Sequence, residues 1–311
     1  MKGLEICEKY YRLYGESLFE KYPELMRRAA TGLVGEGSEC LGFDDEISRD
    51  HDFDFGFCIW LTDEDERDYG FALSRAYASL PKEFMGLKRA ADSPVGGSRR
   101  GVMTIGGFYQ KFLGGKTVPD ELYRWLYIPS YALSAATNGK VFYDGLGSFS
   151  QIREQLKKGY PEDIRRKKIA SNLVMMAQTG QYNYVRCVKR GETGAAGIAI
   201  AQFVRHALSV IYLLNGVYEP FYKWVYRGLR DLPILSDLEL TLTGLTELGN
   251  TNAEAEKKSE IIDDTANLIS QTLKEQRLIS ETGIDLESFA YCVNDTISDC
   301  NIRNMHIMEG L

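Results

Sequence analysis

Apolar and polar residues alternate with a helical period at the start of the chain. Residues 4–30 predict one or two helices, with a break or a new start at Pro23. A short apolar run at residues 29–38 ends in glycines, which predicts a strand that leads into a tight loop. Residues 53–61 are rich in aromatic and β-branched side chains and predict a strand in the core. Helices followed by two strands are therefore expected.

A further helix and a third strand are predicted next. Residues 63–66 are all acidic and suit the first turn of a helix, which we expect to run to Leu80. After a glycine-rich loop at residues 86–101, residues 102–105 predict another strand. The segment 31–105 is thus predicted to form strand, strand, helix and strand.

From Pro119 onward the pattern is mainly helical. A helix is expected at about residues 121–136, and a short strand lies between the turns at residues 138 and 145. The later predicted helices are 151–158, 162–179, 193–216, 219–229 and others between 234 and 308. We therefore predict an α+β protein in three parts: N-terminal helices at 1–30, a small α/β domain with a mixed sheet at 31–147, and a mainly helical domain at 148–311.

The charge of the chain is acidic on average and unevenly distributed. The 311 residues include 37 Lys and Arg against 44 Asp and Glu, a formal net charge of −7. An extended nucleic-acid footprint normally needs a basic excess, so none is expected. However, 13 acids and two arginines lie between Glu36 and Asp68, and the other residues together carry +4. Such a distribution suits a bound cation that meets a phosphate ligand.

The sequence predicts a cytoplasmic protein without a membrane partner. Its first residues lack the apolar core of a signal peptide, and no window approaches the roughly 18 to 20 apolar residues of a spanning helix. Six cysteines are scattered without a Cys-x-x-Cys pair, and the chain has three histidines, so a zinc site is not expected. Reduced, mostly buried thiols are the expectation.

One stretch early in the chain carries the residues with the clearest chemistry. Gly37 and Ser38 follow an apolar strand, so backbone amides and the Ser38 hydroxyl can approach a phosphate closely. Asp50, Asp52 and Asp54 alternate as the chain enters a strand, where side chains two apart point to the same face. Two such carboxylates repel each other unless a cation such as Mg²⁺ or Mn²⁺ lies between them. The pattern predicts metal-assisted attack on the α-phosphorus of a nucleoside triphosphate.

These residues resemble the signature of the nucleotidyltransferase superfamily that shares the DNA polymerase beta fold, a Gly-Ser followed at a short distance by Asp-x-Asp on a strand. The chain also resembles the bacterial domain-of-unknown-function family 4037, a branch of that superfamily. The segments that carry this second resemblance are residues 37–39, 41–44, 48–52, 125–126, 128–129, 139–144, 160–163 and 218–224.

The resemblance implies a nucleotidyltransferase-like N-terminal domain. It further implies an enzyme that moves a nucleoside monophosphate from a nucleoside triphosphate to a hydroxyl group of an acceptor, which is either a small molecule such as an antibiotic or a macromolecule. Spacing alone leaves two catalytic, metal-binding pairs open, Asp50 with Asp52 and Asp52 with Asp54. The resemblance favours the first pair.

Three basic residues are further candidates for nucleotide binding. Arg99 and Arg100 lie on the glycine-rich loop, and the planar guanidinium suits phosphate oxygens, although a surface loop without a ligand is the alternative. Lys223 follows the turn at Pro220 and could bind a phosphate. The alternative is a solvated Lys223 beside a packed Trp224.

The chain departs from the superfamily at one position. Active members usually add a third carboxylate on a later strand, but residues 102–105 have none, and Met103 stands at the corresponding place. Asp144, Glu192 and Glu219 are the alternative acids. Without one, the alternative function is a catalytically silent nucleotide-binding module used for regulation.

Overall fold

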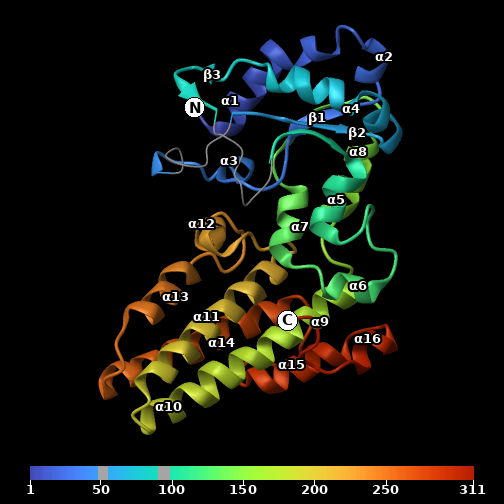
Figure 1. Ribbon diagram of the computed structural model, residues 1–311. Coiled ribbons are helices and arrows are strands. Elements are labelled where there is room, and N and C mark those ends of the chain that lie inside the picture. The colour runs from blue at the N-terminus through green and yellow to red at the C-terminus, as the bar shows by residue number, and fades with distance from the viewer. Residues whose placement is uncertain (48–54, 90–98) are drawn as a thin grey trace. The chain divides into compact units, whose positions relative to one another are not determined.

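The computed structural model describes residues 1–47, 55–89 and 99–311, and it divides into two compact units (Figure 1). The first unit comprises Met1–Pro119 and Ser130–Lys158, and the second comprises Asp120–Pro129 and Gly159–Leu311. In the described part of the chain, all strands belong to the first unit. The predicted α+β class is therefore confirmed.

The first unit is built around a mixed sheet with the strand order β5-β2-β1-β6. Its strands are β1 (Ala30–Leu33), β2 (Cys58–Leu61), β5 (Gly101–Thr104) and β6 (Lys140–Asp144). β2 pairs with β5 in parallel, whereas β1 pairs with β2 and β6 in antiparallel orientation. Because Gly32 pairs with Cys58 and Leu33 with Lys140, β1 ends where β2, β5 and β6 begin. We call this end of the sheet the loop end.

Several short helices and one long helix surround the sheet. They are α1 (Gly3–Tyr10), a π-helical turn (Tyr11–Gly15), a 3-10 turn (Glu16–Phe19), α2 (Pro23–Met26), α3 (Ser38–Leu41), α4 (Asp63–Ala78), α5 (Ile105–Leu113), α7 (Ser130–Thr137) and α8 (Ser148–Leu156). Pro23 opens α2, as expected for a residue that lacks an amide hydrogen. The predicted order of strand, strand, helix and strand is confirmed by β1, β2, α4 and β5. The hairpin of β3 (Glu83–Phe84) and β4 (Leu87–Lys88) was not predicted.

Side chains of β2 enter two hydrophobic layers, because successive residues of a strand point to opposite faces. Ile59 and Leu61 pack in one cluster with residues of α1 and α4. Trp60 lies on the other face, where its ring stacks on Phe149 of α8 with a centroid distance of 3.9 Å and meets Phe108 of α5 edge-on. Helices therefore cover both faces, and all of β2 is buried.

The contacts divide the chain at different points from those expected from sequence. We expected the helical domain to start at residue 148, but α8 belongs to the first unit because Phe149 fills its core. The helix expected at residues 121–136 is in fact two helices, α6 (Leu122–Leu126) and α7. Pro129 lies between them, and proline both lacks an amide hydrogen and disfavours helical backbone in the preceding residue.

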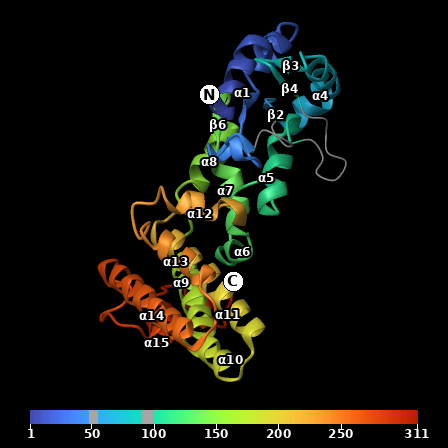
Figure 2. The ribbon, with the colours of Figure 1, turned by 90° about the vertical axis from the view of Figure 1, so that its left-hand side faces the viewer.

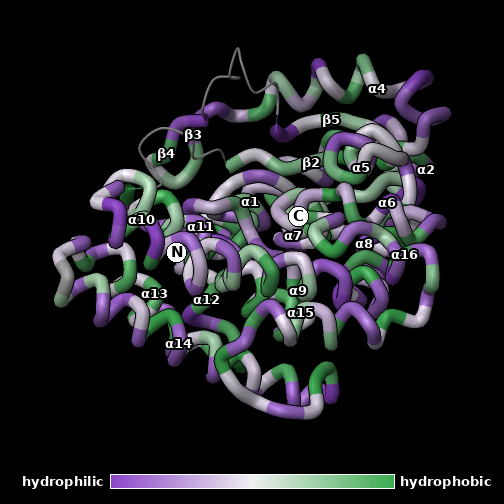
Figure 3. The backbone as a smooth tube through the Cα atoms, turned by 90° about the horizontal axis from the view of Figure 1, so that it is seen from below, coloured by the Kyte–Doolittle hydropathy of each residue, from purple (hydrophilic) through white to green (hydrophobic). Residues whose placement is uncertain are grey.

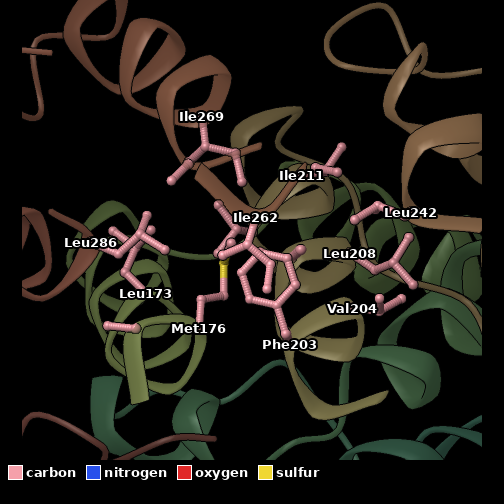
Figure 4. Close-up of a cluster of buried hydrophobic side chains, with 14 of the residues drawn as sticks. Leu173, Met176, Phe203, Val204, Leu208, Ile211, Leu242, Ile262, Ile269 and Leu286 are labelled. Atoms are coloured by element: carbon pink, nitrogen blue, oxygen red, sulfur yellow. The ribbon is translucent and has the colours of Figure 1, made fainter. Parts of the chain in front are cut away.

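The second unit is a bundle of helices. Its elements are α6, α9 (Glu162–Met176), a π-helical turn (Ala177–Tyr184), α10 (Val185–Lys189), α11 (Thr193–Leu214), a 3-10 turn (Tyr222–Trp224), α12 (Val225–Leu229), α13 (Leu238–Glu247), α14 (Asn252–Glu275), α15 (Leu286–Asp295) and α16 (Cys300–Asn304). Figure 2 shows α9, α11 and α14 lying side by side. Their buried side chains, including Met176, Phe203 and Ile262, form the core in Figure 4.

Helix α11 is more apolar than the sequence analysis allowed. By length and composition it could cross a membrane, because its most apolar stretch has a mean hydropathy of 1.5. However, 61% of that stretch is buried inside the protein. Side chains such as Phe203 and Leu208 account for this apolarity, because they pack against the neighbouring helices. By contrast, the tube in Figure 3 alternates between hydrophilic and hydrophobic residues along α4, which covers one face of the sheet.

Candidate functional site

The residues predicted from sequence fall into three groups. Asp50, Asp52 and Asp54 lie outside the described residues, so their prediction as catalytic and metal-binding groups stays a prediction. Gly37 and Ser38 follow β1 at the loop end of the sheet. Arg99 and Arg100 immediately precede β5 at the same end. Lys223 belongs to the second unit. In the described part of the chain, no group of three His, Cys, Asp or Glu residues could hold a metal ion.

Residues 35–40, which we call the 35–40 turn, follow β1 and include the first three residues of α3. Gly35 and Gly37 have φ angles of 124° and 127°, a conformation that side-chain-bearing residues rarely adopt. At Gly37 an added Cβ would lie 2.5 Å from the Glu39 carboxylate. Ser38 is half-buried and begins α3. The glycines therefore allow a close turn of the chain directly before the predicted phosphate-binding serine.

One side of the turn is held by the residues that precede β6. The Asn138 side chain accepts a hydrogen bond from the Gly35 amide at 2.9 Å and donates one to the Gly35 carbonyl at 2.7 Å. The Gly139 amide donates to the Cys40 carbonyl at 2.8 Å. Arg153 of α8 in turn donates to the carbonyls of Asn138 and Gly139, at 3.0 and 3.1 Å. Sequence reasoning treated this Asn-Gly pair as a turn only, because nothing local reveals a partner about a hundred residues away.

The other side of the turn is held by Arg100, which was predicted to bind a nucleotide or to lie on a surface loop, and which is in fact buried. Its side chain is 2% exposed and forms an ion pair with Glu39, whose side chain is 3% exposed. It also donates to the Glu36 carbonyl at 3.3 Å and lies 3.7 Å from the Cys40 sulfur. Burial raises the pKa of the Cys40 thiol to about 12, so the thiol stays protonated at neutral pH. Arg100 therefore stabilises the 35–40 turn from a buried position.

The remaining basic candidates are closer to the surface. Arg99 is half-buried, and its carbonyl accepts a hydrogen bond from the Cys58 thiol at 3.5 Å. Lys223 is exposed in the 3-10 turn, and its ammonium group lies 5.4 Å from the centroid of the Trp224 ring. Both positions leave the prediction of phosphate binding to be tested.

Two of the acids considered as a third carboxylate, Asp144 and Glu219, already accept hydrogen bonds from other residues. Asp144 pairs with Ala30, so it lies at the opposite end of the sheet from the 35–40 turn. Its carboxylate accepts hydrogen bonds from the amides of Gly147 and Ser150, at 2.9 and 2.8 Å, and thereby caps α8. Glu219 of the second unit is 4% exposed and accepts a hydrogen bond from Ser209. Asp144 is therefore not a suitable third acid for this site.

A second polar cluster is buried in the helical unit. His206 of α11 lies 2.8 Å from the Asn172 side-chain oxygen, and the Asn172 amide group donates to the Lys168 carbonyl. The Nδ1 atom of His206 therefore carries the proton. Burial, together with the positive charge of Arg205, lowers the pKa of His206 to about 4.

This histidine is expected to make the protein acid-sensitive. An unfolded histidine binds a proton below about pH 6.5, whereas His206 in the folded protein does not until about pH 4. Stability should therefore fall as the pH drops from about 6.5 to 4, by about 3 kcal/mol in total. Urea unfolding across this range should show a smaller decline in His206→Asn, which keeps a donor near Asn172. The exposed His306→Asn variant serves as a control, and equal declines in all three proteins would contradict the prediction.

Comparisons with known proteins agree with part of the sequence analysis. Residues 125–225 match the family model of a domain of unknown function, DUF4037. The crystal structure of a nucleotidyltransferase-like protein from Exiguobacterium sibiricum 255-15, at 1.90 Å resolution, is similar to this chain at 12% identity and a TM-score of 0.36, over 88% of this chain and 81% of that chain. No curated protein matches the chain. The predicted resemblance to the DUF4037 family is thus confirmed over residues 125–225, and a nucleotidyltransferase-like protein is among the structural neighbours of the chain.

Proposed function

We propose that the protein is a metal-dependent nucleotidyltransferase that moves a nucleoside monophosphate from a nucleoside triphosphate to a hydroxyl acceptor. The proposal is carried by the 35–40 turn, which lies at the loop end of the sheet where three strands begin. The connection from this turn to the start of β2 carries Asp50, Asp52 and Asp54. One continuous connection therefore supplies both a phosphate-binding turn and hard oxygen ligands.

In the proposed reaction, the acceptor oxygen attacks the α-phosphorus and the bond to the β-phosphate oxygen breaks. Pyrophosphate leaves, and the hydroxyl proton is released to solvent. Backbone amides at Gly37 and the hydroxyl of Ser38 bind phosphate oxygens and orient the chain of phosphates. Asp50 with Asp52, or Asp52 with Asp54, would hold Mg²⁺ or Mn²⁺, which supplies neutralisation of the triphosphate charge.

Arg99 completes the proposed nucleotide contacts of the first unit. Arg99 precedes β5 at the loop end of the sheet and carries a guanidinium that suits phosphate oxygens. Lys223 belongs to the second unit and is proposed separately as a phosphate-binding residue, on its charge and exposure. We assign Arg100 differently, because its guanidinium is buried against Glu39.

A catalytically silent nucleotide-binding module is the second candidate. It is favoured by the composition of β5, in which Met103 pairs with Trp60 of β2 and no residue is acidic. The position of Asp144 at the opposite end of the sheet strengthens this alternative.

A labelling experiment separates the two candidates. The protein is incubated with each nucleoside triphosphate, labelled at the α-phosphorus, together with Mg²⁺ or Mn²⁺ and a cell extract. We expect the wild type to transfer label. Asp52→Ala should lose this transfer, and the control variant Asp295→Ala, at an exposed residue, should keep it. Binding without transfer that survives Asp52→Ala would favour the silent module, and a wild type that binds no nucleotide would contradict both candidates.

A further inference from the structure

The 35–40 turn needs external support to keep one conformation. Its two glycines at positive φ have wide conformational freedom, so ordering them costs more entropy than ordering other residues. A turn that a ligand must order binds that ligand more weakly than a turn that is already ordered. The residues that fix the turn therefore affect the affinity for any anion bound there.

Asn138 supplies this support through the backbone of Gly35. Its side chain bonds to both the amide and the carbonyl of that residue, which leaves Gly35 little freedom to rotate. Gly139 holds the far end of the turn through the Cys40 carbonyl. An added Cβ at Gly139 would lie 1.9 Å from the Leu33 carbonyl oxygen. A glycine is therefore needed for the backbone at residue 139 to lie this close to the end of β1.

Arg100 supplies support from the β5 side. It bonds to the Glu36 carbonyl and to the Glu39 carboxylate, on either side of Gly37 and Ser38. Both charged side chains are almost fully buried, so neither can swing out to solvent without breaking the pair. The segment that holds the predicted phosphate ligands is therefore held at both ends, by residues that precede the two edge strands β5 and β6.

We infer that Asn138 and Arg100 are positioning residues that keep the 35–40 turn in its anion-binding conformation before a ligand arrives. This inference rests on the proposed function, since it assumes that the turn receives the phosphates of a nucleoside triphosphate. Neither side chain needs to touch the ligand. Their effect is to lower the entropic cost of binding at Gly37 and Ser38.

The second unit offers a matched control for Asn138. Asn215 bonds to the amide and the carbonyl of Ile234 with its side chain, at 3.0 and 2.9 Å, and it is half-buried like Asn138. Asn215→Ala thus removes the same kind of paired hydrogen bonds to the backbone, at a position where no ligand contact is proposed. The two alanine variants should lose similar amounts of thermal stability.

The decisive measurement is the affinity of each variant for magnesium tripolyphosphate, by calorimetry well below the melting temperature. Inorganic tripolyphosphate has no base or sugar, so it probes the turn directly. Asn138→Ala should bind it about tenfold more weakly than the wild type, and Asn215→Ala should bind it normally. Equal binding by all three proteins would overturn the inference but not the proposed function. A wild type that binds neither tripolyphosphate nor any nucleotide would overturn both.

Hydrogen exchange gives a readout on the wild type that does not depend on the folding of a variant. If Asn138 and Arg100 order the turn, the Gly35 amide should be protected from exchange without any ligand, because the Asn138 side chain accepts its hydrogen bond. Protection that appears only after tripolyphosphate is added would overturn the inference.

Discussion

Replacing Arg100 with methionine is expected to lower the free energy of unfolding by about 3–5 kcal/mol, because Glu39 would remain buried without its counter-charge. Both side chains of the pair are at most 3% exposed, so water cannot take the place of the lost guanidinium. The Glu36 carbonyl would also lose a donor. Denaturant unfolding of the two proteins, followed by circular dichroism, measures the difference.

A surface ion pair on the same turn provides the control. Lys111 bonds to the Glu36 carboxylate at 2.7 Å, but both side chains are about half exposed. Lys111→Met should therefore cost less than about 1 kcal/mol. The double variant Arg100→Met/Glu39→Met should recover much of the lost stability, since neither buried charge remains. An Arg100→Met variant as stable as Lys111→Met would show that the buried pair does not form.

Replacing Phe149 with alanine is expected to destabilise the first unit by a similar amount, about 3–5 kcal/mol. The Phe149 ring is fully buried and lies nearly parallel to the Trp60 ring, at an interplanar angle of 19°. Its removal leaves a cavity beside a strand that is buried on both faces. Thermal unfolding measured by circular dichroism should show the loss.

The control for Phe149 is a phenylalanine of the same unit that packs against little. Phe71 of α4 is 78% exposed, so Phe71→Ala should change the stability by no more than about 0.5 kcal/mol. If Phe149→Ala were as mild as Phe71→Ala, α8 would not be part of the core of the first unit. The domain boundary expected at residue 147 would then be the better description.

Local patterns predicted the elements that depend on neighbouring residues. The acidic first turn of α4 was predicted because acids favour a helix N-terminus, and the structure adds the Thr62 side chain, which accepts a hydrogen bond from the Asp65 amide. The β-branched and aromatic run indicated β2, although this strand begins only at Cys58. The glycines before Ser38 indicated the turn correctly.

Features that depend on distant parts of the chain could not be predicted in this way. The burial of Arg100 results from an ion pair with a residue 61 positions away, and the Asn138 clamp spans 103 positions. Asp144 was a reasonable candidate acid until the antiparallel register of β1 and β6 placed it at the far end of the sheet. Sequence spacing specifies which side chains share a face, but register and strand order decide which of them meet.

The ten residues Asp120–Pro129 belong to the second unit but lie in the sequence between two segments of the first, which affects how the protein can be divided. The chain leaves the first unit after Pro119, returns at Ser130 and leaves again after Lys158, so the two units share three covalent connections. A protease that cuts at one of these connections would leave the units tethered by the other two, at high effective concentration. No single truncation can therefore yield either unit free of residues from the other, and a nicked protein should still migrate as one particle under native conditions.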